Sequence, residues 1–517
     1  MHDATNSERL TPAVFAVAAV ALTLSAFGLF KLQQANSGVS RDHLNLGPTP
    51  VTVYRLDTDD DAAPRPVVII SHGFAGSQQL MQPFAVTLAK NGYIAVTFDY
   101  AGHGRNLEPL SGDITEVEGA TLALVEQTNT IVDAALALPG AGGGLAVLGH
   151  SMASDIVIRY AQSDERVDAT LAVSMFSPAV TATSPDNLLV IVGGLEGFLK
   201  EEALRVLGLV TDTPEEGVTV GNVDDGSARR IAFADGAEHV GVLYSQESMT
   251  ETVAWLDAVF DRSGSGYADA RGLAIVLLIL GASILAWPLA KLLPVVSRPP
   301  AGASLPWRQL FPAAAIPAIA TPVFLWWFPA DFFGVLVGGY LAVHFLVYGL
   351  IGAACLWWLK GRGSDDAANQ IDKTKLVIAS IAATLYTAGV FALILDSYVT
   401  SFAITPPRLP LVALMLAGTL SYFLADEWIT HGATTARGGH LFTRVCFLVS
   451  LSIAVALSFE DLFFLLIIAA VIVIYFLVYG YFSKWIYAAT GHPAVGAIAN
   501  AVAFAWALTA VFPFLAG

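Results

Sequence analysis

The hydrophobic pattern of the chain changes near residue 270. Before that point, apolar runs of about five residues alternate with segments in which apolar residues recur every three or four positions. After it, the apolar runs lengthen to about 20 residues and carry few charges. Short continuous runs are typical of strands covered on both faces, whereas the long runs are typical of helices that cross a membrane. The pattern therefore predicts an α/β domain followed by a helical membrane domain.

The α/β domain is expected to occupy residues 33–268 as a single domain. A weakly alternating segment, 51–56, is typical of an edge strand, and continuous apolar runs predict strands at 67–71, 94–98, 145–149, 171–175, 188–192 and 230–234. Helical periodicity predicts helices at 80–91, 117–138, 152–162, 198–207 and 246–260. Because strands and helices alternate, the predicted fold is a doubly wound, mostly parallel sheet.

Nine apolar segments predict transmembrane helices. The first, 13–30, has no charged residue, and an uncleaved anchor within residues 1–32 is favoured over a cleaved signal peptide, because the run is long and no A-x-A cleavage site follows it. Residues 33–50 are polar and are expected to form a tether. The other segments form an all-α membrane domain over 269–517, with spans near 273–293, 309–328, 333–358, 375–395, 409–429, 441–459, 461–483 and 494–515.

Composition supports a membrane protein with an acidic α/β domain. The chain is 55% hydrophobic and only 13% charged, which excludes an ordinary soluble protein. Residues 33–270 carry 32 Asp and Glu against 12 Lys and Arg, so an acidic surface argues against nucleic acid as a partner. The two cysteines, Cys355 and Cys446, lie in apolar runs and offer neither a disulfide framework nor a cysteine metal site.

The distribution of Lys and Arg between the predicted spans indicates an orientation, since these residues concentrate on the cytoplasmic side. With the N-terminus inside, the cytoplasmic segments hold Arg9, Lys291, Arg298, Arg308, Lys360, Arg362, Lys373, Lys375, Arg437, Arg444 and Lys484. The opposite side holds Lys31, Arg271 and Arg408. The expected location is therefore the cell (plasma or inner) membrane, with the N-terminus cytoplasmic and the α/β domain outside the cytoplasm.

One serine stands at a turn between a predicted strand and a predicted helix. The segment 145–154 reads LAVLGHSMAS, with Ser151 at the turn and the small residues Gly149 and Ala153 on either side. Small neighbours are needed there because the strand and helix backbones pass close to each other. The segment resembles the nucleophile elbow, G-x-S-x-G, of the α/β-hydrolase superfamily, with Ala153 where that pattern has glycine. The resemblance implies that Ser151 is a catalytic nucleophile.

Two further motifs occur in the superfamily's order. Segment 71–76, SHGFAG, resembles the HG loop, and by that resemblance the backbone N–H groups of Phe74 and Met152 would form an oxyanion hole. Segment 98–104, FDYAGHG, is similar to the D-x-x-G-H-G stretch of many lipase-like and peptidase-like members and is expected to form a turn. His72 is expected to shape the HG loop, and His103 is not expected to be catalytic.

A serine nucleophile needs a base and an orienting acid, and the superfamily places both after the elbow. The superfamily's order is serine, acid, histidine, which implies Glu196, a few residues beyond the run 188–192, as the acid and His239, after the run 230–234, as the base. Glutamate departs from the commoner aspartate, and Asp224 and Asp225 are reserve candidates for the acid. No cofactor and no metal are expected at this site.

These motifs favour a membrane-bound serine hydrolase of the esterase or lipase type, with peptidase activity as a variant. Two alternatives stay open: a transporter or channel whose external domain only regulates it, and an acyltransferase that uses the same serine. Only about 14 residues separate Ser174 from Leu188, too few for a cap domain, so the membrane domain is the expected cover and a hydrophobic ester or lipid the expected substrate. The oligomeric state is left open.

Polar residues in the predicted spans are few. His344 lies inside a span, where a neutral histidine hydrogen-bonded to a neighbouring helix is favoured over a functional group. Five carboxylates, Asp396, Asp426, Glu427, Glu460 and Asp461, fall near predicted span ends, where water is expected to reach them. They predict no ion path.

Overall fold

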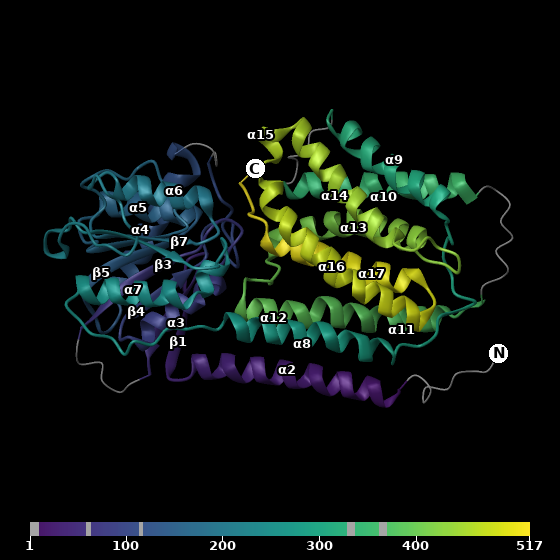
Figure 1. The fold of residues 1–517 in the computed structure, drawn as a ribbon, viewed down its shortest axis with the longest axis horizontal. Helices are drawn as coiled ribbons and strands as arrows, with labels where there is room; N and C mark the ends of the chain where they lie inside the picture. Colours follow the sequence, from purple (N-terminus) through teal and green to yellow (C-terminus); the bar gives the residue numbers. More distant parts are fainter. Residues whose placement is uncertain (1–9, 58–63, 113–116, 328–336, 361–369, 517) are drawn as a thin grey trace.

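The computed structural model describes residues 10–57, 64–112, 117–327, 337–360 and 370–516. The chain forms two parts that lie side by side, a sheet with helices on both faces and a bundle of long helices (Figure 1). The predicted combination of an α/β domain with an all-α helical region is confirmed.

The sheet has eight strands, seven of which overlap the predicted ones. They are β1 (Val39–Leu46), β2 (Thr49–Leu56), β3 (Arg65–Ser71), β4 (Ile94–Phe98), β5 (Ala141–His150), β6 (Ala169–Val173), β7 (Leu188–Gly193) and β8 (Arg229–Ala234). Their order is β1-β2-β4-β3-β5-β6-β7-β8. The pairs β1/β2 and β2/β4 are antiparallel, and every other pair is parallel. The prediction of a mostly parallel sheet is therefore correct.

Five helices cover the two faces of the sheet. On one face lie α3 (Gln82–Lys90) and α7 (Gln246–Val259), and on the other lie α4 (Leu122–Leu136), α5 (Met152–Ser163) and α6 (Gly197–Leu207) (Figure 1). Successive residues of a strand point to opposite faces, so Val68 packs with Phe84 of α3 whereas Val67 packs with Ile131 of α4. Burial on both faces explains why these strands are continuous apolar runs.

The prediction for residues 33–56 is wrong in two respects. Residues 39–46, expected in a polar tether, form β1, which pairs antiparallel with β2 from Val39 opposite Leu56 to Leu46 opposite Thr49. The edge strand is therefore β1 and not the segment 51–56. An edge strand exposed over much of its length needs no apolar side chains, and the sequence of β1, VSRDHLNL, gives no hydrophobic signal.

The helical region contains the segments expected to cross a membrane. These are α2 (Pro12–Asn36), α8 (Gly272–Ala290), α9 (Trp307–Leu325), α10 (Gly338–Lys360), α11 (Lys373–Thr384) continued by α12 (Phe391–Tyr398), α13 (Leu409–Thr430), α14 (Gly439–Leu457), α16 (Phe464–Thr490) and α17 (Pro493–Val511). Among the described residues, nine helices are long and apolar enough to span a bilayer, and each overlaps a predicted span. The boundary between the predicted spans 309–328 and 333–358 lies outside the described residues.

The N-terminal helix α2 packs along α8, the helix that follows the α/β domain (Figure 1). Two glycines permit this close approach. A Cβ atom on Gly28 would lie 2.6 Å from the carbonyl oxygen of Ala274, and one on Gly281 would lie 2.7 Å from that of Ala21. Small residues at such points let helix backbones come together in a membrane. The segments before and after the α/β domain are thus held together.

Side chains inside the bundle correct one expectation and agree with another. Asp426 and Glu427, expected within reach of water, are 4% and 0% exposed, because neighbouring helices cover the last turn of α13. His344 is fully buried, with Nε2 3.0 Å from the hydroxyl oxygen of Ser450 on α14 and Nδ1 3.3 Å from that of Tyr340. A buried histidine hydrogen-bonded to a neighbouring helix is therefore what the structure has.

Polar contacts join the helical region to the α/β domain. Arg408, 1% exposed at the start of α13, donates to the carbonyl oxygens of Thr509 and Phe512 and, over 2.7 Å, to that of Gly102. The segment after α17 then pairs with the loop after β4, since the amides of Leu110 and Phe514 donate to Phe514 and Gly102 over 2.8 Å each. The loop that contains the D-x-x-G-H-G stretch is thereby fixed to the helices.

Candidate active site

Ser151 stands at the turn between β5 and α5 with φ 55° and ψ −118°. A positive φ is costly for a residue with a side chain, and strain of this kind is typical of a nucleophile elbow. A Cβ atom on Gly149 would lie 2.3 Å from the carbonyl oxygen of Ala153, so no larger residue fits at position 149. Ala153 itself is fully buried, which shows that its methyl group is accommodated where the pattern has glycine.

The three side chains predicted as nucleophile, base and acid form one hydrogen-bonded series. The Oγ of Ser151 lies 2.9 Å from the Nε2 of His239, and the Nδ1 of His239 lies 2.5 Å from the Oε1 of Glu196. In this arrangement an imidazole can accept the proton of a serine hydroxyl while the carboxylate holds its tautomer and stabilises the imidazolium. The segments that supply the three groups follow β5, β7 and β8, whose carboxyl ends meet at one edge of the sheet.

Glu196 is held by further hydrogen bonds. Its Oε2 accepts from the hydroxyl of Ser174 and from the amide of Gly193, each over 2.7 Å. Burial, which leaves only 7% of the side chain exposed, raises the pKa of the carboxyl, but the hydrogen bonds from His239, Ser174 and Gly193 outweigh it and the pKa lies below its usual value. The carboxylate is therefore ionised at neutral pH.

The reserve acids lie elsewhere. Asp224 and Asp225 belong to the short turn Val223–Asp225, where the carboxylate of Asp225 accepts from the amide and hydroxyl of Ser227. Within the described part of the chain neither carboxylate contacts His239. The structure thus brings Glu196, and neither aspartate, to the imidazole.

The HG loop passes beside Ser151. A Cβ atom on Gly73 would lie 3.0 Å from the Cβ of Ser151. The amide of Met152 is the first of α5 and belongs to the N–H groups that a helix leaves without an internal partner. Among the described residues the amides of Phe74 and Met152 donate to no other group, so both are available to an oxyanion.

His72 and Asp99 shape the loops around this point. His72 is fully buried, with Nδ1 2.8 Å from the carbonyl oxygen of Gly73 and Nε2 accepting from the amide of Tyr100 over 3.1 Å. Burial lowers the pKa of His72, which keeps the imidazole neutral in this role. Asp99, also buried, accepts from the amides of Gln78 and Arg105, which fixes the turn of the D-x-x-G-H-G stretch.

Two supporting residues were missed by the sequence reasoning. His150 places its Nε2 2.9 Å from the carbonyl oxygen of His239, and burial lowers its pKa to about 3, so the ring stays neutral beside the base. Ser174 bonds the acid, as described above. The available signal was positional: Ser174 follows β6, whose end lies between β5 and β7 at the same edge of the sheet.

Exposed apolar side chains follow the strands that supply the site. They come from the segments after β6, β7 and β8 and are Phe176, Leu195, Phe198 and Val240, with exposed fractions of 53%, 69%, 66% and 43%. The rings of Phe176 and Phe198 lie 5.7 Å apart. From the helical region, the ring of Phe464 at the start of α16 lies 4.7 Å from that of Phe74 in the HG loop. The bundle thus reaches the loop beside Ser151.

Three side chains of types that can bind a metal come together away from this site. Among the described residues such a group is formed by Asp426, Glu427 and His440 in the helical region. Ser151, Glu196 and His239 belong to no such group.

Comparisons with known proteins gave a family match and several similar solved structures. Residues 62–208 match the family model Hydrolase_4, described as serine aminopeptidase, S33. The hypothetical protein PA2218 from Pseudomonas aeruginosa aligns at 13% identity with a TM-score of 0.32, over 44% of this chain and 94% of that chain. TT1662 from Thermus thermophilus aligns at 18% identity with a TM-score of 0.31, over 43% and 98% of the two chains.

A further similar structure is that of a membrane phospholipase A described as a novel bacterial virulence factor, at 13% identity and a TM-score of 0.31, over 47% of this chain and 92% of that chain. Comparison with curated proteins gave no match. With the family match over residues 62–208 and a mixed, mostly parallel eight-stranded sheet, the protein carries an α/β-hydrolase domain, followed by a C-terminal region of long apolar helices.

Proposed function

We propose that the protein is a membrane-bound serine hydrolase that cleaves carboxylic esters of hydrophobic acyl groups through an acyl-enzyme. The hydrogen-bonded series from Ser151 through His239 to Glu196 is the observation that carries this proposal. A regulatory domain without activity would have no need of all three groups in bonding distance, or of a serine with strained backbone angles at the turn.

In the proposed mechanism His239 takes the proton of Ser151 as its Oγ attacks the ester carbonyl carbon. Glu196, ionised at neutral pH, stabilises the imidazolium that forms. The amides of Phe74 and Met152 donate to the oxyanion, and His239 returns its proton to the departing alcohol. Water, activated in turn by His239, then releases the acyl group from Ser151.

The substrate proposal rests on the surroundings of Ser151. The exposed rings of Phe176 and Phe198, with Leu195 and Val240, offer an apolar surface to an acyl chain, and burying such surface on binding is favourable. The contact between Phe464 and Phe74 supports the helical region as the cover of the α/β domain, in which the described residues between β6 and β7 form no cap. We further propose that this domain lies outside the cytoplasm, from the Lys and Arg distribution.

A chain-length series of p-nitrophenyl esters tests the proposal on the full-length protein in detergent. We expect hydrolysis that depends on Ser151 and a kcat/KM that rises from acetyl to longer acyl groups. A rate that is unchanged by Ser151→Ala would remove the proposed function. Aminoacyl p-nitroanilides tested in parallel report the peptidase variant, and an added alcohol acceptor reports acyl transfer, since only the second nucleophile differs.

A further inference from the structure

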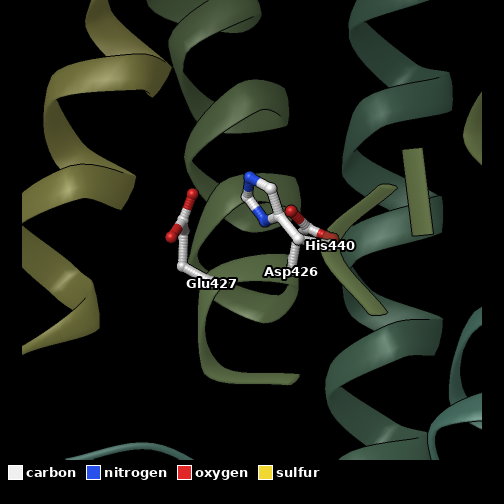
Figure 2. Close-up of side chains that lie close together, drawn as sticks. All are labelled: Asp426, Glu427 and His440. Atoms are coloured by element: carbon white, nitrogen blue, oxygen red, sulfur yellow. The ribbon is translucent and has the colours of Figure 1, made fainter. Parts of the chain in front are cut away.

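Two carboxylates and an imidazole meet inside the helical bundle, apart from the hydrolase site. Asp426 and Glu427 belong to the last turn of α13, and His440 is the second residue of α14. One ligand atom from each lies within 4.8 Å of those from the other two, and Figure 2 shows the three side chains gathered between the helices. We call these three residues the α13–α14 cluster.

Each member of the cluster has a buried polar atom without a hydrogen-bond partner among the described residues. These atoms are Oδ2 of Asp426, Oε1 of Glu427 and Nε2 of His440. Asp426 and Glu427 are 4% and 0% exposed, so bulk water does not supply their missing hydrogen bonds. Leaving buried polar atoms without a partner costs free energy, and a bound cation would supply the missing partner.

Neighbouring side chains satisfy only part of the cluster. The Nη2 of Arg444 lies 3.9 Å from Oε1 of Glu427, and this guanidinium compensates one of the two carboxylates. Glu427 Oε2 accepts from the hydroxyl of Ser483 over 2.5 Å and lies 3.1 Å from Nδ1 of His431. Oδ2 of Asp426, in contrast, has no hydrogen-bond partner among the described residues, and a bound cation would satisfy it.

We propose that Asp426, Glu427 and His440 bind a divalent first-row transition metal. Carboxylate oxygens with an imidazole nitrogen form a donor set that such ions accept, and three protein ligands leave a fourth position.

The cluster is placed for access from water. His440 is only partly buried, and the turn that joins α13 to α14 begins one residue after Thr430. The ion therefore enters at the end of the bundle, without crossing the apolar core. Arg408, which bonds the α/β domain, stands at the other end of α13, about 27 Å away at 1.5 Å per residue. The metal site is thus separate from the proposed hydrolase chemistry.

Metal binding by the tag-free, full-length protein in detergent tests the proposal. The protein is stripped of metal with a chelator, the chelator is removed, and Zn²⁺ or Co²⁺ is added. We then expect elemental analysis to find one metal ion per chain. The visible spectrum of bound Co²⁺ should lack a thiolate charge-transfer band, since Cys355 and Cys446 are not ligands. His440→Cys should add that band, which a merely structural role of residue 440 would not produce.

Variants locate the site. Asp426→Asn and Glu427→Gln should weaken Co²⁺ binding more than about tenfold, the loss that even an outer partner of a ligand can cause. Glu460→Gln, an exposed glutamate on α15 (Phe459–Leu462), and Ser151→Ala should bind as the wild type does. Gel filtration checks the folding of every variant, and labelling of Ser151 by a serine-reactive probe checks it in the variants that keep this serine. Failure of the wild type to retain metal, or equal binding by variants that fold, would overturn the proposal.

Discussion

Phe464, the first residue of α16, lies ring to ring with Phe74 of the HG loop, at a centroid distance of 4.7 Å and an interplanar angle of 32°. The two residues are 390 positions apart and belong to the two parts of the molecule. The amide of Phe74 is one of the two proposed oxyanion donors, so the helical region touches a loop on which the proposed chemistry depends.

Removal of this ring should lower ester hydrolysis without abolishing it. An aromatic pair contributes about 0.5–1.5 kcal/mol beyond its buried area, so Phe464→Ala should reduce kcat/KM roughly 2- to 10-fold. The loss should be greater for long-chain than for acetyl esters, because Phe464 also belongs to the proposed cover. Leu466→Ala, an exposed neighbour on α16, is the matched control. Equal losses in the two variants would show that the ring contact has no specific effect.

The acid of the proposed triad can be identified by two amide substitutions. In the wild type one oxygen of Glu196 accepts from His239 and the other accepts from Ser174 and Gly193. The amide of Glu196→Gln has only one oxygen and cannot accept all three hydrogen bonds. The value of kcat should therefore fall by about 10³–10⁴, as for a triad that loses its orienting carboxylate. Asp225→Asn, which affects only a local turn, should stay within about twofold of the wild type. Steady-state kinetics with one soluble ester give both values. The opposite outcome would transfer the acid role to Asp225.

The lowered pKa of Glu196 also predicts a pH dependence of stability. A carboxyl whose pKa is lower in the folded than in the unfolded protein contributes stability above its ordinary pKa, near 4.5, and loses it as the pH falls through the folded value. Thermal unfolding should therefore show wild type more stable than Glu196→Gln at pH 7, with the difference shrinking below about pH 4.5. A difference that stays constant down to pH 3 would mean that the carboxylate is not stabilised by its partners.

The proposed orientation follows from an odd number of spans and a cytoplasmic N-terminus. A reporter that is active only in the cytoplasm, fused after the last residue, should be inactive, and one fused within the 431–438 turn should be active. Strong activity of the C-terminal fusion would mean an even number of spans or an inverted chain.

The sequence predicts the sheet and the order of the site residues well, for a physical reason. Strands buried on both faces must be continuous apolar runs, and residues at the carboxyl ends of neighbouring parallel strands must come close together. The superfamily's order of serine, acid and histidine then implied Glu196 and His239, and their positions after two of these strands explain why they lie beside Ser151. The polar strand β1 gave no such signal, because an exposed edge imposes none.

Contacts between distant segments were beyond prediction. Nothing in the local sequence of Arg408 indicates that it bonds Gly102, or that the segment after α17 pairs with the loop after β4. The burial of Asp426 and Glu427 likewise depends on how the helices pack, so residues near predicted span ends were expected to meet water. Such positions follow from tertiary packing and not from periodicity.

Covalent labelling of the full-length protein by a fluorophosphonate probe, with peptide mapping by mass spectrometry, tests the proposed nucleophile most directly. We predict a single modified residue, Ser151, with loss of ester hydrolysis in proportion to labelling. Ser151→Ala should be unlabelled and retain less than about a hundredth of the activity, since loss of a triad nucleophile costs several decades. Ser163→Ala, at the end of the same helix, should label as the wild type does. Modification of another residue, or hydrolysis by Ser151→Ala above that level, would contradict the assignment of Ser151 as the nucleophile.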